Sequence, residues 1–153
     1  MGHMACQTKW VGGIGFESQI RDHKVAMDSR SDGGKDQGPS PKELLLASIC
    51  GCTGMDVVSI LQKMRVGLQS CNVDADTDTT AGYPSIFDRV KLKFLVKGDM
   101  KNEQLMKAVT LSMTKYCGVS AMVVKASPID YEVFLNDVKI GEGQADFESA
   151  AKA

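Results

Sequence analysis

The sequence is poor in histidine and aromatic residues, and neither sign of charge dominates it. Its 153 residues include two histidines, one tryptophan and a formal net charge of −1. Without a basic excess the chain has no field that attracts a phosphate backbone, so nucleic acid is not an expected partner. Charged residues interrupt the apolar runs, so we expect none to reach the length of a membrane span, and the N-terminus lacks the regions of a secretory signal. We therefore expect no membrane partner and a cytoplasmic location.

The scarcity of histidine also argues against a metal site. His3 lies in residues 1–4, which resemble a vector-derived remnant, so only His23 belongs to the native chain. There are five cysteines, an odd number, and none forms a Cys-x-x-Cys pair. This spacing offers no Cys/His ligand set, and we expect neither a metal nor a cofactor. In the cytosol such cysteines are reduced, catalytic or redox-active rather than parts of a disulfide framework.

The clearest local signal is the start of a long helix. Ser40 can cap it, Pro41 suits its first position, and Glu43 is placed to complete a capping box. Most of the following residues are apolar or small, which predicts a helix over residues 41–65 that is terminated by Gly67. Because this helix has no wide polar face, we expect it to be the central core helix, buried on most sides.

Alternating polar and apolar residues predict strands on both sides of this helix. The predicted strands cover 7–11, 14–20, 24–28, 71–77, 88–97, 131–135 and 138–140. A second helical segment is expected from Asn102, interrupted at Gly118. This order predicts an α+β fold in a single domain over residues 5–141, with 142–153 as a C-terminal tail that frays.

Cys52 and Cys117 are the first candidates for chemistry. Each lies on or beside a predicted helix and next to glycine, although a free cysteine is often a small buried hydrophobe. Cys52 lies too far along its helix for the dipole to favour a thiolate, and Asp56 would oppose one if it faced the sulfur. Cys117 is better placed if a short helix starts after Gly118.

The other three cysteines carry no motif. Cys50 is two positions from Cys52, about 200° around the helix, so the two cannot face the same site. We expect Cys50 to pack in the core. No function is assigned to Cys6 or Cys71.

Two motifs resemble the OsmC/Ohr family of thiol peroxidases. One is Ser-Pro-Lys-Glu-Leu-Leu-Leu at 40–46 with Gly-Cys-Thr-Gly-Met-Asp-Val-Val-Ser-Ile-Leu at 51–61, and the other is Lys-Tyr-Cys-Gly-Val-Ser-Ala at 115–121. The sequence resembles in particular the OsmC-like branch without assigned substrates. The resemblance implies an OsmC-like fold, in which two long central helices pack against antiparallel sheets in an intertwined homodimer with active sites at its interface.

The resemblance also implies a mechanism. Cys52 matches the peroxidatic cysteine of the family and Cys117 the resolving one. In that mechanism a thiolate attacks the distal oxygen of an organic hydroperoxide, an alcohol leaves, and the sulfenic acid condenses with the second cysteine. A dithiol reductant, lipoyl-linked in the family, restores both thiols. The implied role is defence against oxidative stress.

The residues that would activate the thiol depart from the family pattern. The hydroperoxidase branches place a glutamate directly after the motif proline, where this chain has Lys42. Glu43 follows, but the capping box explains it better. In the hydroperoxidase branches an arginine from the early strands acts together with the motif glutamate to polarise the thiol and the peroxide. Arg21 is the candidate for this arginine, with a solvated turn charge as the alternative interpretation, and Lys42 could itself supply the positive charge. A non-catalytic dimer that binds an apolar or acyl-like ligand in the same pocket is therefore the alternative function.

Overall fold

The computed structural model describes residues 2–31 and 33–148. The chain forms two compact units, Met1–Leu45 and Leu46–Ala153, and we describe each by itself. The assignment of residues 5–141 to one domain stays a prediction. Of the tail 142–153, residues 149–153 lie outside the described part of the chain, and residues 142–144 belong to a strand.

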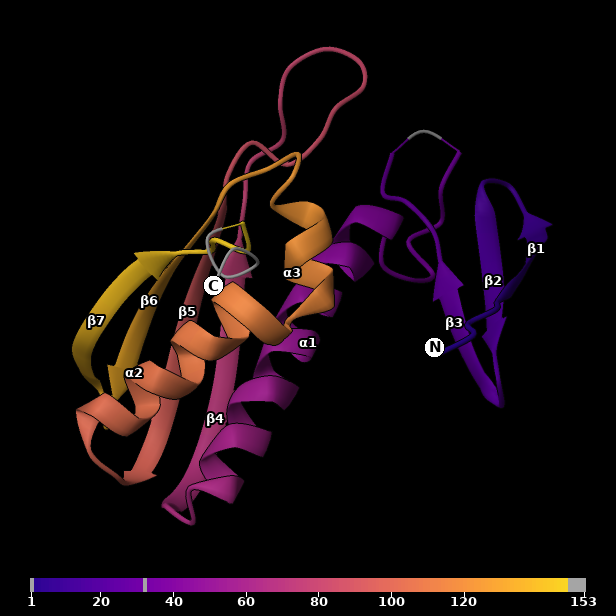
Figure 1. Ribbon diagram of the computed structural model, residues 1–153. Coiled ribbons are helices and arrows are strands. Elements are labelled where there is room, and N and C mark those ends of the chain that lie inside the picture. Colours follow the sequence, from indigo (N-terminus) through magenta and orange to yellow (C-terminus); the bar gives the residue numbers. More distant parts are fainter. Residues whose placement is uncertain (1, 32, 149–153) are drawn as a thin grey trace. The chain divides into compact units, whose positions relative to one another are not determined.

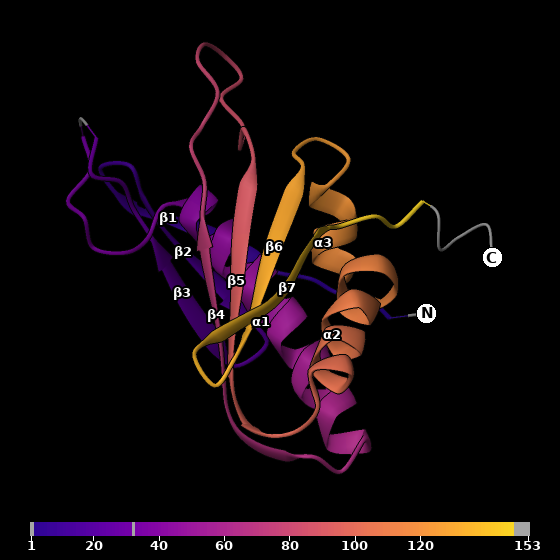
Figure 2. The same cartoon turned by 90° about the vertical axis from the view of Figure 1, so that its left-hand side faces the viewer.

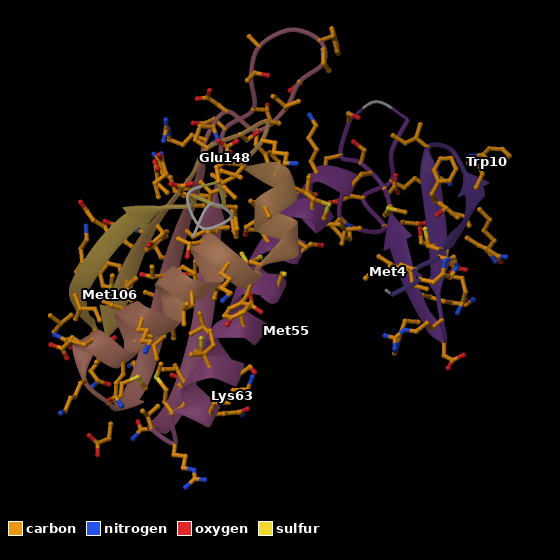
Figure 3. The ribbon with its side chains drawn as sticks, viewed as in Figure 1. Met4, Trp10, Met55, Lys63, Met106 and Glu148 are labelled. Atoms are coloured by element: carbon orange, nitrogen blue, oxygen red, sulfur yellow. The ribbon has the colours of Figure 1, made fainter. Side chains whose placement is uncertain are left out.

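The first unit contains a three-stranded antiparallel sheet of β1 (Gln7–Gly12), β2 (Gly15–Ile20) and β3 (His23–Met27) (Figure 1). In the hairpin between β1 and β2, Gly12 and Gly13 have φ angles of 110° and 56°, a backbone conformation that glycine adopts without steric cost. Many large apolar side chains of this sheet are exposed, and Trp10, labelled in Figure 3, is 66% exposed. This unit therefore leaves apolar surface uncovered.

Helix α1 (Pro41–Lys63) begins at the predicted capping box. The backbone N–H of Ser40 donates to Glu43 Oε2 at 2.7 Å, and the N–H of Glu43 donates to Ser40 Oγ at 3.4 Å. The end of the helix differs from the prediction. Arg65, with φ of 56°, takes the left-handed conformation, while Gly67 already opens the next strand.

The second unit is built on a four-stranded sheet of order β4-β5-β6-β7. Its strands are β4 (Gly67–Asp76), β5 (Val90–Asp99), β6 (Ile129–Leu135) and β7 (Val138–Gln144). The outer pairs are antiparallel, but β5 and β6 pair in parallel, unlike the all-antiparallel expectation. The reason is the helical crossover between them, since a parallel pair cannot be joined by a tight turn.

This crossover consists of α2 (Asn102–Leu111), a π-helical turn η1 (Ser112–Tyr116) and α3 (Gly118–Val123). It confirms the predicted second helix and its interruption. Figure 2 shows α2 and α3, in orange, on one side of the sheet. Buried and exposed side chains therefore alternate along the strands. In β5, Phe94 is buried against the helices while its neighbour Lys93 is exposed.

The core of the second unit lies between the sheet and the helices. Its fully buried large side chains come from α1, the strands and the crossover: Ile49, Leu61, Leu92, Phe94, Leu105, Val109, Met113, Ile129 and Val133. Burying each such side chain stabilises the fold by about 1.5–3 kcal/mol relative to leaving it exposed. This packing fixes the part of α1 from residue 46 onward against the crossover.

Helix α1 buries only a narrow stripe, formed by Ile49, Thr53, Val57 and Leu61. Met55, labelled in Figure 3, is 76% exposed. The expectation that α1 is buried on most sides is therefore wrong within one chain. The expectation that no apolar segment has the length of a membrane span is also wrong, because Asp56 is the one charge in most of this helix.

By length and composition alone α1 could cross a membrane, and 22% of its most apolar 18-residue window is buried. The core helix of a soluble protein passes the same test of length and composition. The observation therefore identifies exposed apolar surface on α1 and does not by itself assign the helix to a membrane.

Candidate active site

Helix α1 and the π-helical turn bring the two candidate cysteines together. Cys52 and Asp56 are one turn apart on α1, so they share a face of the helix. Cys117 follows η1, and its N–H donates to the carbonyl of Ser112 at 3.0 Å, the five-residue spacing of a π turn. The sulfurs of Cys52 and Cys117 and a carboxylate oxygen of Asp56 all lie within 4.8 Å of one another.

Cys117 is the buried member of this cluster, with none of its surface exposed. Its sulfur accepts a hydrogen bond from the N–H of Ser120 at 3.3 Å and lies 3.0 Å from Ser120 Oγ. Burial and, to a smaller extent, the facing Cys52 raise the pKa of the Cys117 thiol to about 11, although the hydrogen bonds with Ser120 lower it in part. A short helix does start after Cys117, and the N–H of Ser120 in its first turn lowers the pKa of the thiol as expected, but the effect of burial is larger.

Cys52 is the accessible member of the pair, since it is only half-buried while Cys117 is fully buried. A small molecule arriving from solvent therefore meets Cys52 first. Of the two sulfurs, that of Cys52 is therefore the more open to solvent.

Asp56 is held beside the sulfurs by a network of hydroxyl groups. Ser112 Oγ donates to Asp56 Oδ2 at 3.0 Å and lies 2.7 Å from Thr53 Oγ1. Because the Ser112 proton is directed to the carboxylate, the Thr53 hydroxyl donates to Ser112. The carboxylate of Asp56 therefore lies beside both sulfurs, the arrangement that the sequence had left open.

The sequence did not reveal the parts played by Thr53, Ser112 and Ser120. Each contributes a hydroxyl that touches a group on the same site, but serine and threonine are too common to stand out in a sequence. The one available signal was the position of Ser120 three residues after Cys117, which suits a side-chain-to-backbone contact at the start of a helix.

The proposed activating residues Arg21, Lys42 and Glu43 all belong to the first unit. Arg21 is exposed in the turn between β2 and β3, with φ of 54°, and Lys42 is exposed in the first turn of α1. Glu43 accepts hydrogen bonds from the backbone and hydroxyl of Ser40, which lower the pKa of its carboxyl group. Glu43 therefore acts in the capping box, and the activating roles of Arg21 and Lys42 stay predictions.

A second pair of cysteines lines a different region of the same unit. Cys50 of α1 and Cys71 of β4 line a groove of about 660 Å³ together with Met55, Val58 and Val73. Burial raises the pKa of both thiols. Cys50 packs against the hydrophobic core, as predicted.

The α+β fold, with a cysteine of the long helix facing one that follows the second helix, is the arrangement expected of OsmC/Ohr proteins. The family model described as OsmC-like protein matches residues 33–132. The chain therefore belongs to the OsmC-like family, which is associated with resistance to peroxide stress.

Individual relatives agree with this assignment. The chain is 39% identical over 134 residues to Protein YhfA of Escherichia coli K12, and the aligned region covers 85% of this chain and 98% of that protein. A hypothetical protein from Aquifex aeolicus VF5 has a TM-score of 0.77 and 28% identity, with coverage of 89% of this chain and 99% of the other. An organic hydroperoxide resistance protein from Elizabethkingia anophelis shares the fold, with a TM-score of 0.63, 14% identity, and coverage of 88% and 96%.

Proposed function

We propose that this protein is a thiol peroxidase that reduces organic hydroperoxides with Cys52 and resolves the product with Cys117. The observation that supports this most is the placement of an accessible sulfur within 4.8 Å of a buried one. Membership of a family that includes organic hydroperoxide resistance proteins adds support.

The reaction proceeds in two steps. The Cys52 thiolate attacks the distal peroxide oxygen, the O–O bond breaks, and the alkoxide takes up a proton and leaves as an alcohol. The Cys117 sulfur then attacks the Cys52 sulfenic acid, and the hydroxyl group leaves as water with the Cys117 proton. A dithiol of lipoyl type reduces the disulfide by exchange.

The raised pKa of Cys117 suits the second step better than the first. At neutral pH Cys117 is a protonated thiol, and a thiol is a weak nucleophile toward peroxide. Cys117 therefore does not react with the peroxide itself. It reacts with the sulfenic acid of Cys52 once this has formed a few ångströms away, because proximity compensates for the low reactivity of the thiol.

Activation of Cys52 needs a positive charge, because Asp56 is negative and lies on the same face of α1. We propose that Lys42 or Arg21 supplies it. The test is the pH dependence of Cys52 alkylation in Lys42→Ala and Arg21→Ala: the variant that lacks the activating charge alkylates Cys52 only at higher pH. Unchanged profiles in both variants would exclude both residues.

A homodimer is part of the proposal because a single chain leaves much apolar surface uncovered. Met55 and Trp10 are 76% and 66% exposed, and the outer edge of β4 pairs with no strand among the described residues. Open strand edges and large apolar patches mark interaction surfaces. Light scattering on the purified protein should give twice the chain mass. We also propose that the dimer acts in the cytoplasm.

The direct test is hydroperoxide consumption by the reduced protein with dihydrolipoamide, compared with a monothiol reductant. We expect turnover with the dithiol, loss in Cys52→Ser, and retention in the matched control Cys50→Ser. If wild type consumes no hydroperoxide, or if Cys52→Ser is as active as wild type, the non-catalytic ligand-binding dimer replaces the enzyme as the proposed function.

A further inference from the structure

We infer that the reduced protein binds one soft divalent cation, of the Zn²⁺ type, between the sulfurs of Cys52 and Cys117 and the carboxylate of Asp56. This site goes beyond the proposed peroxidase activity and uses residues that come together only in the fold.

The three donor atoms have the spacing that such a cation needs. All lie within 4.8 Å of one another. On a tetrahedral zinc with Zn–S bonds of about 2.3 Å, two sulfurs are about 3.8 Å apart. The two sulfurs therefore need to approach each other by at most about 1 Å. Two sulfurs and one oxygen leave the fourth position open for water or an exogenous ligand.

Contacts behind the donors hold two of them in place. Ser112 donates a hydrogen bond to Asp56 Oδ2 at 3.0 Å, and the N–H of Ser120 donates to the Cys117 sulfur at 3.3 Å. Hydrogen bonds of this kind orient the ligands of metal sites. The half-buried Cys52 gives the cation a route from solvent.

A cation also explains why Asp56 lies here. Beside a bound dication its carboxylate is a favourable ligand, and it lies within reach of both sulfurs. Binding displaces the two thiol protons to solvent and leaves two thiolates and one carboxylate around the metal. Because the same sulfurs form the proposed disulfide, metal binding and oxidation exclude each other.

The experiment is a titration of the reduced, metal-free, full-length protein with Co²⁺, whose absorption reports its ligands. We expect one Co²⁺ per chain, thiolate-to-cobalt charge-transfer absorption, tetrahedral visible bands, and displacement by one equivalent of Zn²⁺. Cys52→Ser and Cys117→Ser should lose the charge-transfer absorption, and Asp56→Asn should weaken binding at least about tenfold.

Matched controls separate this site from the other possible ligands. Cys50→Ser, Cys71→Ser and removal of residues 1–4, which carry His3, should leave the titration unchanged. Far-ultraviolet circular dichroism establishes that each variant is folded. Wild type without charge-transfer absorption, unchanged binding in Cys52→Ser, or wild-type affinity in Asp56→Asn would each overturn the inference. Since no hydroperoxide is present, the result is independent of whether the protein turns over peroxide.

Discussion

Helix α1 carries two cysteines that lie in contrasting surroundings. Cys52 faces the sulfur of Cys117 and the carboxylate of Asp56. Cys50 lines an apolar groove with Cys71 across from it. Each pair joins α1 to another element of the same unit, and around the first pair Ser112 donates a hydrogen bond to Asp56 and the N–H of Ser120 donates one to the Cys117 sulfur.

The comparison shows that two pairs of cysteines in one unit can differ in the groups that surround their sulfurs. Burial raises the pKa of Cys50 and of Cys71, and the negative charge of Asp74 adds to the effect on Cys50. Around the first pair, Ser112 and Ser120 donate hydrogen bonds that orient the reacting groups. Helix geometry makes the separation possible, because residues two positions apart point in nearly opposite directions.

The largest expected contrast is between the two cysteines of α1 as nucleophiles. Cys52→Ser should lower the rate of hydroperoxide consumption at least about a thousandfold, because a serine hydroxyl is not ionised near neutral pH. Cys50→Ser should stay within about twofold of wild type. If the two variants lost the same fraction of the rate, the effect of Cys52→Ser would reflect disturbance of the fold and not the loss of a nucleophile.

The second contrast concerns the partner cysteines. Cys117→Ser should retain the first oxidation of Cys52, trapped as a sulfenic acid adduct of dimedone, while steady-state turnover with a dithiol falls on the order of a hundredfold. Cys71→Ser should leave both measurements unchanged. A Cys117→Ser variant with wild-type turnover would remove Cys117 from the mechanism.

A third contrast is the dependence of stability on pH. The pKa of Cys117 is raised from 9.0 to about 11, so the folded state holds this proton more tightly than the unfolded state. The resulting stability is complete below pH 9 and is lost as the pH rises to about 11, by up to about 3 kcal/mol.

Urea unfolding of the reduced protein from pH 8 to pH 11 measures this loss. The slope of stability against pH should be clearly smaller in Cys117→Ala than in wild type. Cys71→Ala, which removes a thiol with a smaller upward pKa shift, should flatten the slope less. Equal slopes in wild type and Cys117→Ala would contradict the account of a buried, protonated thiol.

The smallest contrast tests the hydroxyl network. Ser112→Ala leaves the Thr53 hydroxyl and Asp56 Oδ2 without this partner, which should lower the free energy of unfolding by about 1–3 kcal/mol. Ser59→Ala, at an exposed position of α1, should change it by no more than about 0.5 kcal/mol. Similar losses in both variants would show that the network contributes little.

Much of the fold could be predicted because its signals are local. The capping box of Ser40 and Glu43 marks the start of α1, and the alternation in residues 88–97 indicates β5. The parallel pairing of β5 with β6 could not be predicted, because a period of two identifies a strand but not its partner. The left-handed conformation of Arg65, just beyond the end of α1 at Lys63, was also missed, since glycine is the usual residue in that conformation.

The candidate site could be predicted only in part. Its two cysteines were identified by family resemblance, and Asp56 by its position one turn from Cys52. The π-helical turn Ser112–Tyr116, which shifts the residues that follow it, has no signal in the sequence. The large effect of burial on Cys117 depends on packing between elements far apart in the chain, and no local pattern reports it.

The most direct test of the central claim is peptide mapping by mass spectrometry after one equivalent of an organic hydroperoxide is added to the fully reduced protein. The account predicts rapid formation of a Cys52–Cys117 linked peptide, with Cys50 and Cys71 recovered as alkylated thiols. A Cys50–Cys71 linkage that forms first, or oxidised Cys52 that never links to Cys117, would contradict it.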